Sequence, residues 1–258
     1  MERADKVLVE RGLATTRSAA QRLIDEGRVW LRVGQAADKL IDKASTKVPA
    51  TAELVVQASE ADRYVSRGGL KLAGALAHCG LVVTGYAALD VGISTGGFTD
   101  CLLQQGAKQV VGIDVGHGQL AARLLADPRV TLFEGVNARA PDEAALIAAN
   151  GGQRFDIAVC DVSFISLTLV LPAIARLLHP DAIALLLVKP QFEVGREGLG
   201  GGGIVRNANL YPQVEQKIRQ CAAEHGLHCV DYFASPIAGG DGNREFFLYA
   251  RRIQAENV

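Results

Sequence analysis

The chain has 258 residues, and its 27 Lys and Arg against 28 Asp and Glu give a formal net charge of −1. With 49% hydrophobic and 21% charged residues, it has the composition of an ordinary globular protein with one large domain, or with one medium and one small domain. The near-zero net charge excludes a protein that coats nucleic acid over its whole surface, so an RNA site would have to be a local basic patch.

Membrane insertion, secretion and metal binding are not indicated by the sequence. The longest apolar runs, such as residues 182–188, are too short to cross a bilayer, and the charged N-terminus lacks the hydrophobic segment of a signal peptide. The five cysteines and five histidines show no paired metal-ligand spacing. We therefore expect a cytoplasmic protein with free thiols, no metal site and no association with membranes.

Residues 1–60 are expected to form a small α+β domain, because about sixty residues suffice for one. Two helices are predicted, and Thr16 or Ser18 can cap the second, which Gly27 ends. Two strands with polar turns follow them. The predicted helices lie at residues 3–10 and between Ser18 and Gly27, and the predicted strands at residues 29–33 and 53–57.

Residues 61–84 are expected to form a linker and a helix that leads into a second domain, residues 85–258. There, apolar runs alternate with helical patterns, as in a parallel sheet that helices cover on both faces. The last two runs follow each other without a helix, which predicts a final antiparallel hairpin. The seven predicted strands of this α/β Rossmann-like fold are residues 87–91, 110–114, 130–135, 156–161, 182–189, 229–233 and 245–251.

A glycine-rich loop, residues 92–97, follows the first strand of the predicted parallel sheet. Asp114 ends the next strand about 20 residues later, where an acid can accept hydrogen bonds from ribose hydroxyls. The loop pattern and Asp90 favour S-adenosylmethionine over NAD, because a carboxylate suits a cationic amino-acid group and repels a pyrophosphate. Asp90 can alternatively be an acid that caps the next helix. The predicted cofactor contacts are Asp90, Gly92, Thr95, Gly96, Gly97, Asp114, Asn137 and Asp161.

Four charged residues lie where the active site of such a fold is expected. Asp161 and Lys189 close the fourth and fifth strands, and Glu245 opens the last strand after the turn at residues 239–243. Lys71 lies at the start of the helix that leads into the sheet. Each of these residues taken singly could be a solvated strand end or helix end, but the set of four indicates a catalytic site.

The second domain resembles the FtsJ/RrmJ-like ribose 2′-O-methyltransferases, whose Lys-Asp-Lys-Glu tetrad matches these four residues in order. The whole chain resembles the TlyA family, in which an S4 RNA-binding domain precedes such a methyltransferase domain. Val33-Gly34 departs from the S4 pattern, in which Asn-Gly is usual, and Val disfavours the positive φ of a type I′ turn. The motifs that carry the resemblance are residues 3–9, 18–27, 63–71, 90–100, 160–166 and 188–193.

The resemblance implies S-adenosylmethionine-dependent methylation of cytidine 2′-hydroxyls in 23S and, in some members, 16S ribosomal RNA. Lys189 would act on the hydroxyl either as a general base or as a cation that stabilises the developing alkoxide, and the sequence leaves both roles open. The expected partners are ribosomal RNA or ribosomal subunits, while the oligomeric state is not indicated.

RNA binding is expected from a local surface of the first domain, although residues 1–60 hold ten Lys and Arg against nine Asp and Glu. Three rival functions are a membrane-active hemolysin, a label that the family carries, a non-catalytic RNA-binding protein, and a NAD-dependent dehydrogenase. The residues predicted to bind RNA are Arg3, Lys6, Arg17, Arg22, Arg28, Arg63 and Arg67.

Overall fold

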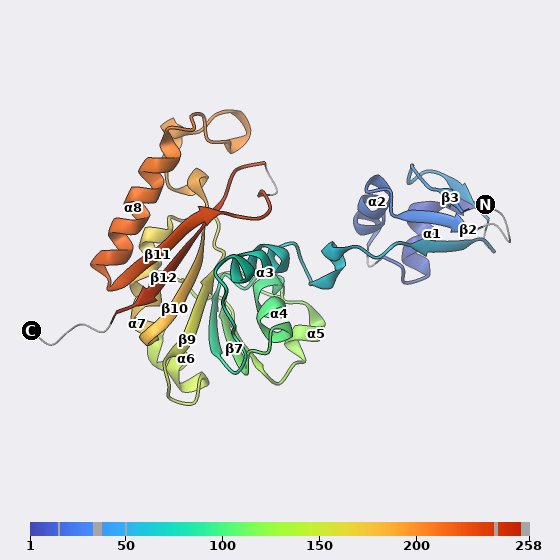
Figure 1. Ribbon diagram of the computed structural model, residues 1–258. Coiled ribbons are helices and arrows are strands. Elements are labelled where there is room, and N and C mark those ends of the chain that lie inside the picture. Colours follow the sequence, from blue (N-terminus) through green and yellow to red (C-terminus); the bar gives the residue numbers. More distant parts are fainter. Residues whose placement is uncertain (15, 33–37, 50, 240–241, 254–258) are drawn as a thin grey trace, which may run out of the picture. The chain divides into compact units, whose positions relative to one another are not determined.

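The computed structural model describes residues 1–14, 16–32, 38–49, 51–239 and 242–253, which fall into two compact units, Met1–Asp62 and Arg63–Val258 (Figure 1). The Val33-Gly34 turn lies outside the described residues. So do residues 240–241 of the turn that precedes Glu245.

The first unit is a small α+β fold of two helices and short antiparallel strands. Thr16 rather than Ser18 caps the second helix, because its hydroxyl accepts a hydrogen bond from the Ala19 amide. That helix ends before Gly27, whose φ of +69° is a conformation that glycine adopts without strain. The elements are β1 (Glu2–Arg3), α1 (Ala4–Glu10), α2 (Arg17–Asp25), β2 (Val29–Arg32), β3 (Lys39–Leu40), β4 (Lys47–Val48) and β5 (Glu53–Val56).

Strand β2 pairs antiparallel with both β3 and β5, and β1 pairs with β4. The strands β1, β3 and β4 were not expected from the sequence, because two residues are too few to show an alternation of apolar and polar side chains. The core of this unit consists of buried side chains from both helices and the strands: Ala4, Leu8, Ala20, Ile24, Val29, Ile41, Val48 and Leu54.

The second unit contains a seven-stranded sheet in the order β11-β12-β10-β9-β6-β7-β8. Five strands are parallel, and β12 runs antiparallel to both of its neighbours, which confirms the predicted fold with its final hairpin. The strands are β6 (Ala87–Val91), β7 (Gln109–Ile113), β8 (Val130–Phe133), β9 (Phe155–Cys160), β10 (Leu178–Val188), β11 (Leu227–Ala234) and β12 (Phe246–Arg252).

Helices cover both faces of this sheet (Figure 1). In β10, Leu186 packs toward α6, α7 and α8, whereas its neighbours Leu185 and Leu187 pack toward α3, α4 and α5. Alternate side chains thus serve two separate cores, which explains why the strands are continuous apolar runs. The helices are α3 (Gly68–His78), α4 (Gly97–Gln104), α5 (Ala122–Leu125), α6 (Glu143–Ala149), α7 (Leu171–Leu177) and α8 (Leu210–Glu224).

The strand order places the functional residues at one edge of the sheet. The chain runs outward from β6 to β7 and β8 on one side, and through β9 and β10 on the other. The crossover point between β6 and β9 is where ligands bind in open α/β sheets, beyond the carboxyl ends of the strands. Because β12 is antiparallel and Phe246 pairs with Val188, Glu245 reaches the same edge as Lys189.

Candidate active site

The four predicted catalytic side chains form two ion pairs. Lys71 Nζ lies 2.5 Å from Glu245 Oε2, and both side chains are nearly buried. Lys189 Nζ lies 2.5 Å from Asp161 Oδ1 and donates a hydrogen bond of 2.8 Å to Ser163 Oγ. Each lysine is therefore held by a carboxylate, and Lys189 is held by two groups from the segment that follows β9.

Different elements deliver these side chains to one place. Lys71 lies in the first turn of α3, and Asp161 and Lys189 come directly after β9 and β10. A cavity of ≈ 310 Å³ is lined by Lys71, Asp161 and Lys189, while Glu245 does not line it and contacts Lys71. The cavity thus presents two ammonium groups, the Arg67 guanidinium and one carboxylate.

A second cavity of ≈ 670 Å³ adjoins the first, because Gly92, Ser94, Asp161 and Ser163 line both. Its lining includes Asp114, whose two carboxylate oxygens accept hydrogen bonds from the Ser94 amide at 2.8 Å and the Gly116 amide at 2.7 Å. These bonds fix the Asp114 carboxylate and leave lone pairs for hydroxyl donors of a ligand. The two cavities form one cleft along the carboxyl edge of the sheet.

The glycines of the loop are needed for the protein's own packing as well as for the cleft. Gly92 has φ +84°, and an added Cβ would lie 2.6 Å from the Asp161 carbonyl oxygen. A Cβ on Gly97 would lie 2.3 Å from Ser66 Oγ, at the start of α3. Gly92, Gly97 and Thr95 line the first cavity, which is the proposed catalytic cavity, whereas Gly96 lines neither cavity and packs against side chains of the 120–124 segment.

Asp90 lies elsewhere than the cofactor interpretation predicted. Its side chain is fully buried, lines neither cavity, and accepts a hydrogen bond of 2.7 Å from Thr99 Oγ1 in the first turn of α4. Burial raises the pKa of the Asp90 carboxyl to about 7, against the opposing effect of the Thr99 hydrogen bond. The alternative interpretation, an acid that holds the start of the next helix, describes its position.

Comparison with known proteins identifies the family. The profile described as FtsJ-like methyltransferase matches residues 64–252, and the one described as S4 domain matches residues 2–31. The chain is 44% identical over 249 residues to the 16S/23S rRNA (cytidine-2′-O)-methyltransferase TlyA of Mycobacterium tuberculosis, which covers 96% of the chain and 89% of that protein. The chain belongs to the TlyA family.

Other TlyA-family relatives match over similar lengths. YqxC of Bacillus subtilis, provisionally named an rRNA methyltransferase, is 45% identical over 248 residues, which are 96% of the chain and 85% of YqxC. A solved structure from Streptococcus thermophilus, provisionally named a hemolysin, aligns with a TM-score of 0.74 and 40% identity over 98% of this chain and 89% of that one. No helix among the described residues is long and apolar enough to cross a membrane.

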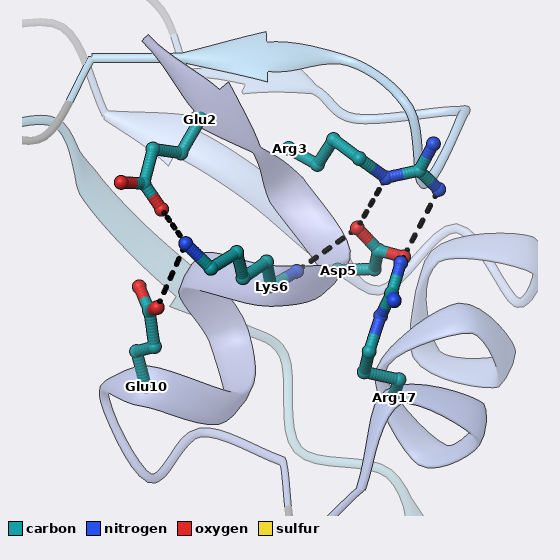
Figure 2. Close-up of polar contacts among 6 residues, drawn as sticks. All are labelled: Glu2, Arg3, Asp5, Lys6, Glu10 and Arg17. Carbon is teal, nitrogen blue, oxygen red and sulfur yellow. Dashed lines mark hydrogen bonds and ion pairs between the residues drawn. The ribbon is translucent and has the colours of Figure 1, made fainter.

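In the S4 unit of this TlyA-family protein, acidic side chains hold three of the cations predicted to bind RNA, namely Arg3, Lys6 and Arg17 (Figure 2). The nearly buried Asp5 accepts hydrogen bonds from Arg3 at 3.0 Å and from Arg17 at 2.8 Å. The hydrogen bond from Arg3 and the charge of Arg17 hold the pKa of Asp5 well below its usual range. Lys6 lies between Glu2 at 2.9 Å and Glu10 at 3.2 Å, and this trio has a net charge of −1.

The remaining predicted RNA-binding residues differ in how freely they can bind a ligand. Arg28 is mostly buried and bonded to Glu26, Asp62 and the Gln57 carbonyl, so its donors serve the S4 unit itself. Arg22 is exposed on α2. In the second unit, Arg67 lines the catalytic cavity and donates to the Ala238 carbonyl, and the Arg63 guanidinium lies over the Tyr64 ring at 5.3 Å.

Sequence reasoning missed several residues of the cleft. The sequence assigns Ser163 no role beyond its place in the 160–166 motif, yet its hydroxyl accepts the hydrogen bond from Lys189. Phe164 is 92% exposed at the second cavity, with a φ of +64° that is rare for a bulky side chain. The available signal was the position of Ser163 and Phe164 in the loop that follows β9, since loops at this edge carry ligand contacts.

The second cavity has the chemical character of a nucleoside site. Asp114 supplies fixed carboxylate oxygens at one end, and Asn137 supplies a side-chain amide. The rest of the lining includes the apolar side chains Ile113, Val115, Val136, Ala138, Val162, Ile165 and Leu169. A polar ribose and a flat apolar base match such a division.

Proposed function

We propose that the protein is an S-adenosylmethionine-dependent methyltransferase that acts on the ribose 2′-hydroxyl of cytidine in 23S rRNA, with 16S rRNA as a second substrate to be tested. The observation that carries the proposal is the meeting of two lysine–carboxylate pairs in a cavity that opens into a nucleoside-sized cleft. The function of the M. tuberculosis relative and that of the 23S rRNA (cytidine-2′-O)-methyltransferase TlyA of Campylobacter jejuni support this substrate class.

The adjoining cavity would hold the cofactor, which when bound supplies an electrophilic methyl group. Asp114 would accept hydrogen bonds from the ribose hydroxyls, and Asn137 with the apolar walls would hold the adenine. Gly92 and Asp161, which line both cavities, would lie beside the amino-acid part, with Thr95 and Gly97 at the loop that begins α4. Asp90 and Gly96, which line neither cavity, would act indirectly through the shape of this loop.

Lys189 would act on the substrate hydroxyl. Asp161, 2.5 Å from the Lys189 nitrogen, and Ser163, which accepts a hydrogen bond from it, together orient the group. A remaining N–H of Lys189 would donate a hydrogen bond to the ribose 2′-oxygen and stabilise the charge that develops there as the hydroxyl proton passes to water. Because the nitrogen is held between two oxygens, this geometry supports charge stabilisation over general-base catalysis.

The pair Lys71–Glu245 would complete the electrostatic environment of the cavity. Glu245 is nearly buried behind Lys71, so it fixes the lysine without occupying the space for substrate. Two ammonium groups in one cavity favour a negatively charged oxygen between them. Each lysine has its own carboxylate, which limits the cost of burying the two lysine charges.

The target is proposed to be a nucleotide turned out of its RNA helix. The exposed Phe164 ring, 5.2 Å from the Phe192 ring, offers a surface on which a base can stack beside the cleft. Cys160, the thiol nearest to Asp161 in sequence, is buried in the core, and burial raises its pKa. It is therefore no nucleophile for methylation of a cytosine ring.

The S4 unit, which we propose as a separate domain ending near residue 60, would supply affinity for the ribosomal substrate. Its RNA-binding cations would be Arg3, Arg17 and Arg22. In the second unit, Arg63 and Arg67 would also contact RNA, and Arg67 lines the cavity. Lys6 and Arg28 would contribute less, because nearby carboxylates offset their charges. A ribosomal substrate implies that the enzyme works in the cytoplasm.

Alkaline hydrolysis tests the proposed function. A free 2′-hydroxyl attacks the neighbouring phosphate in alkali, and a methyl group on that oxygen prevents the attack. Ribosomal RNA treated with the protein and S-adenosylmethionine should contain a new alkali-resistant linkage after a cytidine, and RNA treated with the Lys189→Ala variant should not. A methylated product that alkali cleaves at every position would place the methyl group on a base and overturn the assignment.

A further inference from the structure

Glu193 is a buried acid close to the active site to which the proposed reaction gives no role. It follows the short 3₁₀ turn Pro190–Phe192, four residues after Lys189, and its side chain is 1% exposed. Its carboxylate accepts hydrogen bonds of 2.6 Å from the Leu167 amide, 2.6 Å from the Ser166 hydroxyl and 2.8 Å from Lys217 Nζ on α8.

Two of these donors belong to the segment 162–169, which follows Asp161. The same segment carries Ser163, the hydrogen-bond acceptor of Lys189, and it forms one wall of the second cavity. Glu193 thus joins the segment after β10 to the segment after β9 through charge-assisted hydrogen bonds. Between these segments the described contacts also include Lys189 with Asp161 and the Phe164–Phe192 ring contact.

The 162–169 segment needs such an anchor because its backbone is strained. Phe164 has a φ of +64°, a conformation that a bulky residue keeps only where its surroundings impose it. The Phe164 side chain is exposed, so its own packing contributes little to that constraint. The hydrogen bonds to Ser166 and Leu167 hold the chain just beyond the strained residue.

We propose that Glu193 is a positioning residue that fixes the 162–169 segment and thereby the Ser163 hydroxyl and the cavity wall. Its effect on catalysis rests on the proposed function, and its effect on the segment does not. The rival interpretation is a structural ion pair between Glu193 and α8. Lys217 is 45% exposed and approaches the same carboxylate from the solvent side, so removing either partner distinguishes the two interpretations.

Hydrogen exchange of the full-length protein without ligands tests the anchor directly. In Glu193→Ala, amides of residues 162–169 should exchange about 10-fold faster than in the wild type, because two hydrogen bonds to the segment are lost. Lys217→Met keeps both bonds to Glu193 and removes from the segment only the long 3.5 Å hydrogen bond that Lys217 donates to Ser166, so exchange should stay within about 2-fold of the wild type. Unchanged exchange in Glu193→Ala, or equal acceleration in both variants, would overturn the proposal.

Kinetics at saturating RNA and S-adenosylmethionine test the consequence for the reaction. Glu193→Ala should lower kcat about 30-fold, as expected when a catalytic group is misplaced by a fraction of an ångström, and Lys217→Met should stay within about 3-fold. If Glu193→Ala does not fold, Glu193→Gln replaces it. This isosteric variant keeps an acceptor for the Leu167 amide, so we expect a smaller loss and a smaller acceleration of exchange.

Different results would overturn the proposed function and the proposed positioning role of Glu193. A wild-type protein without methyl-transfer activity on rRNA would overturn the proposed function, while faster exchange in Glu193→Ala would still support the anchor. An active wild type whose Glu193→Ala variant keeps the full kcat would overturn the positioning role and leave the proposed function intact. A loss of kcat in Lys217→Met as large as in Glu193→Ala would favour the structural ion pair.

Discussion

Both units of the molecule hold basic side chains against carboxylates, but they do so at different depths. In the catalytic cavity the side chains of Lys71 and Lys189 are 10% and 12% exposed. In the S4 unit the side chains of Arg3 and Arg17 are 44% and 64% exposed around the buried Asp5. Buried charges act strongly on one fixed point, whereas exposed charges remain available to a large ligand and are screened by salt.

The two units would therefore have different roles, one in catalysis and one in RNA binding. Under the proposed function, ion pairs in the cleft would orient ammonium groups toward a developing charge, which matters in the transition state. Ion pairs on the S4 surface leave other N–H groups of each arginine facing solvent, which suits phosphates of RNA. Substitutions in the cleft should therefore change kcat, and substitutions on the S4 surface should change RNA affinity and its dependence on salt.

The largest effect is expected from Lys189→Ala. Removing the group that stabilises the developing oxygen charge should lower kcat by about 10³-fold or more. The dissociation constant for S-adenosylmethionine, measured by calorimetry, should stay within about 3-fold, because the lysine acts in the transition state. Turnover close to wild type would remove Lys189 from the catalytic set and, with it, the contrast between the two units.

The buried Asp90 allows a test, without substrate, of how burial changes the titration of an acidic group. Because burial raises the pKa of Asp90 to about 7, the folded protein keeps a proton that the unfolded chain loses near pH 4. Between about pH 4 and about pH 7 the folded state therefore binds more protons than the unfolded state. As pH rises through this range, Asp90 should reduce the free energy of unfolding. The reduction amounts to at most about 4 kcal/mol, at about 1.4 kcal/mol for each pH unit.

Asp90→Asn removes this titration and keeps an oxygen that can accept the Thr99 hydrogen bond. The stability of the variant relative to the wild type should therefore rise between pH 5 and pH 8, as measured by urea unfolding at both pH values. If the difference in unfolding free energy between the variant and the wild type is constant with pH, Asp90 stays ionised in the folded protein. A direct contact between Asp90 and a cationic ligand would then again be a valid interpretation.

The next effect concerns the cofactor cleft. Asp114→Ala removes the proposed ribose acceptor and also frees the Ser94 and Gly116 amides. The loss of a charge-assisted hydrogen bond should cost about 1.5–3 kcal/mol, or roughly 10- to 150-fold in the dissociation constant for S-adenosylmethionine. Asn137→Ala, on the exposed side of the cavity, should have a smaller effect. Binding unchanged in Asp114→Ala would contradict the nucleoside interpretation of this cavity.

The sheet and the sites at its edge were predictable because each has a local signal. Continuous apolar runs marked the strands, and the charged residue that follows a run marked Asp161 and Lys189. The partners of these residues were less predictable. The pairing of Lys71 with Glu245 depends on the register of β10 with β12 and on the packing of α3, and neither follows from spacing in the sequence.

The sequence alone could not decide the contacts of three side chains, those of Asp90, Glu193 and Ser163. An acid at a strand end can face the ligand or the next helix, and only the rotation of the side chain at that position separates the two cases. Glu193 and Ser163 lie in loops whose conformation depends on contacts made by distant residues, such as Lys217 on α8. In the S4 unit, a list of cations could not reveal that Arg28 is mostly buried.

The smallest effect is expected on the S4 surface, where two neighbouring cations provide a matched pair. Arg17 shares Asp5 with Arg3, so that cluster has a net charge of +1, whereas Lys6 lies between Glu2 and Glu10 in a cluster of −1 (Figure 2). Arg17→Ala should weaken rRNA binding by about 3- to 10-fold and lower the slope of log K against log salt by about 1.

Lys6→Ala should weaken rRNA binding by less than about 2-fold and leave the slope of log K against log salt nearly unchanged, since two carboxylates already offset the charge of Lys6. Binding to a ribosomal RNA fragment at several salt concentrations measures both variants, and the kcat at saturating RNA should be unchanged in each because neither residue belongs to the unit that holds the cleft. A larger loss of affinity in Lys6→Ala than in Arg17→Ala would move the RNA-binding surface to the other side of α1. A loss of kcat without a loss of affinity would show that the exposed charges of the S4 unit act on the reaction itself. The exposed fraction of the basic side chains would then not separate residues that bind RNA from residues that act in catalysis.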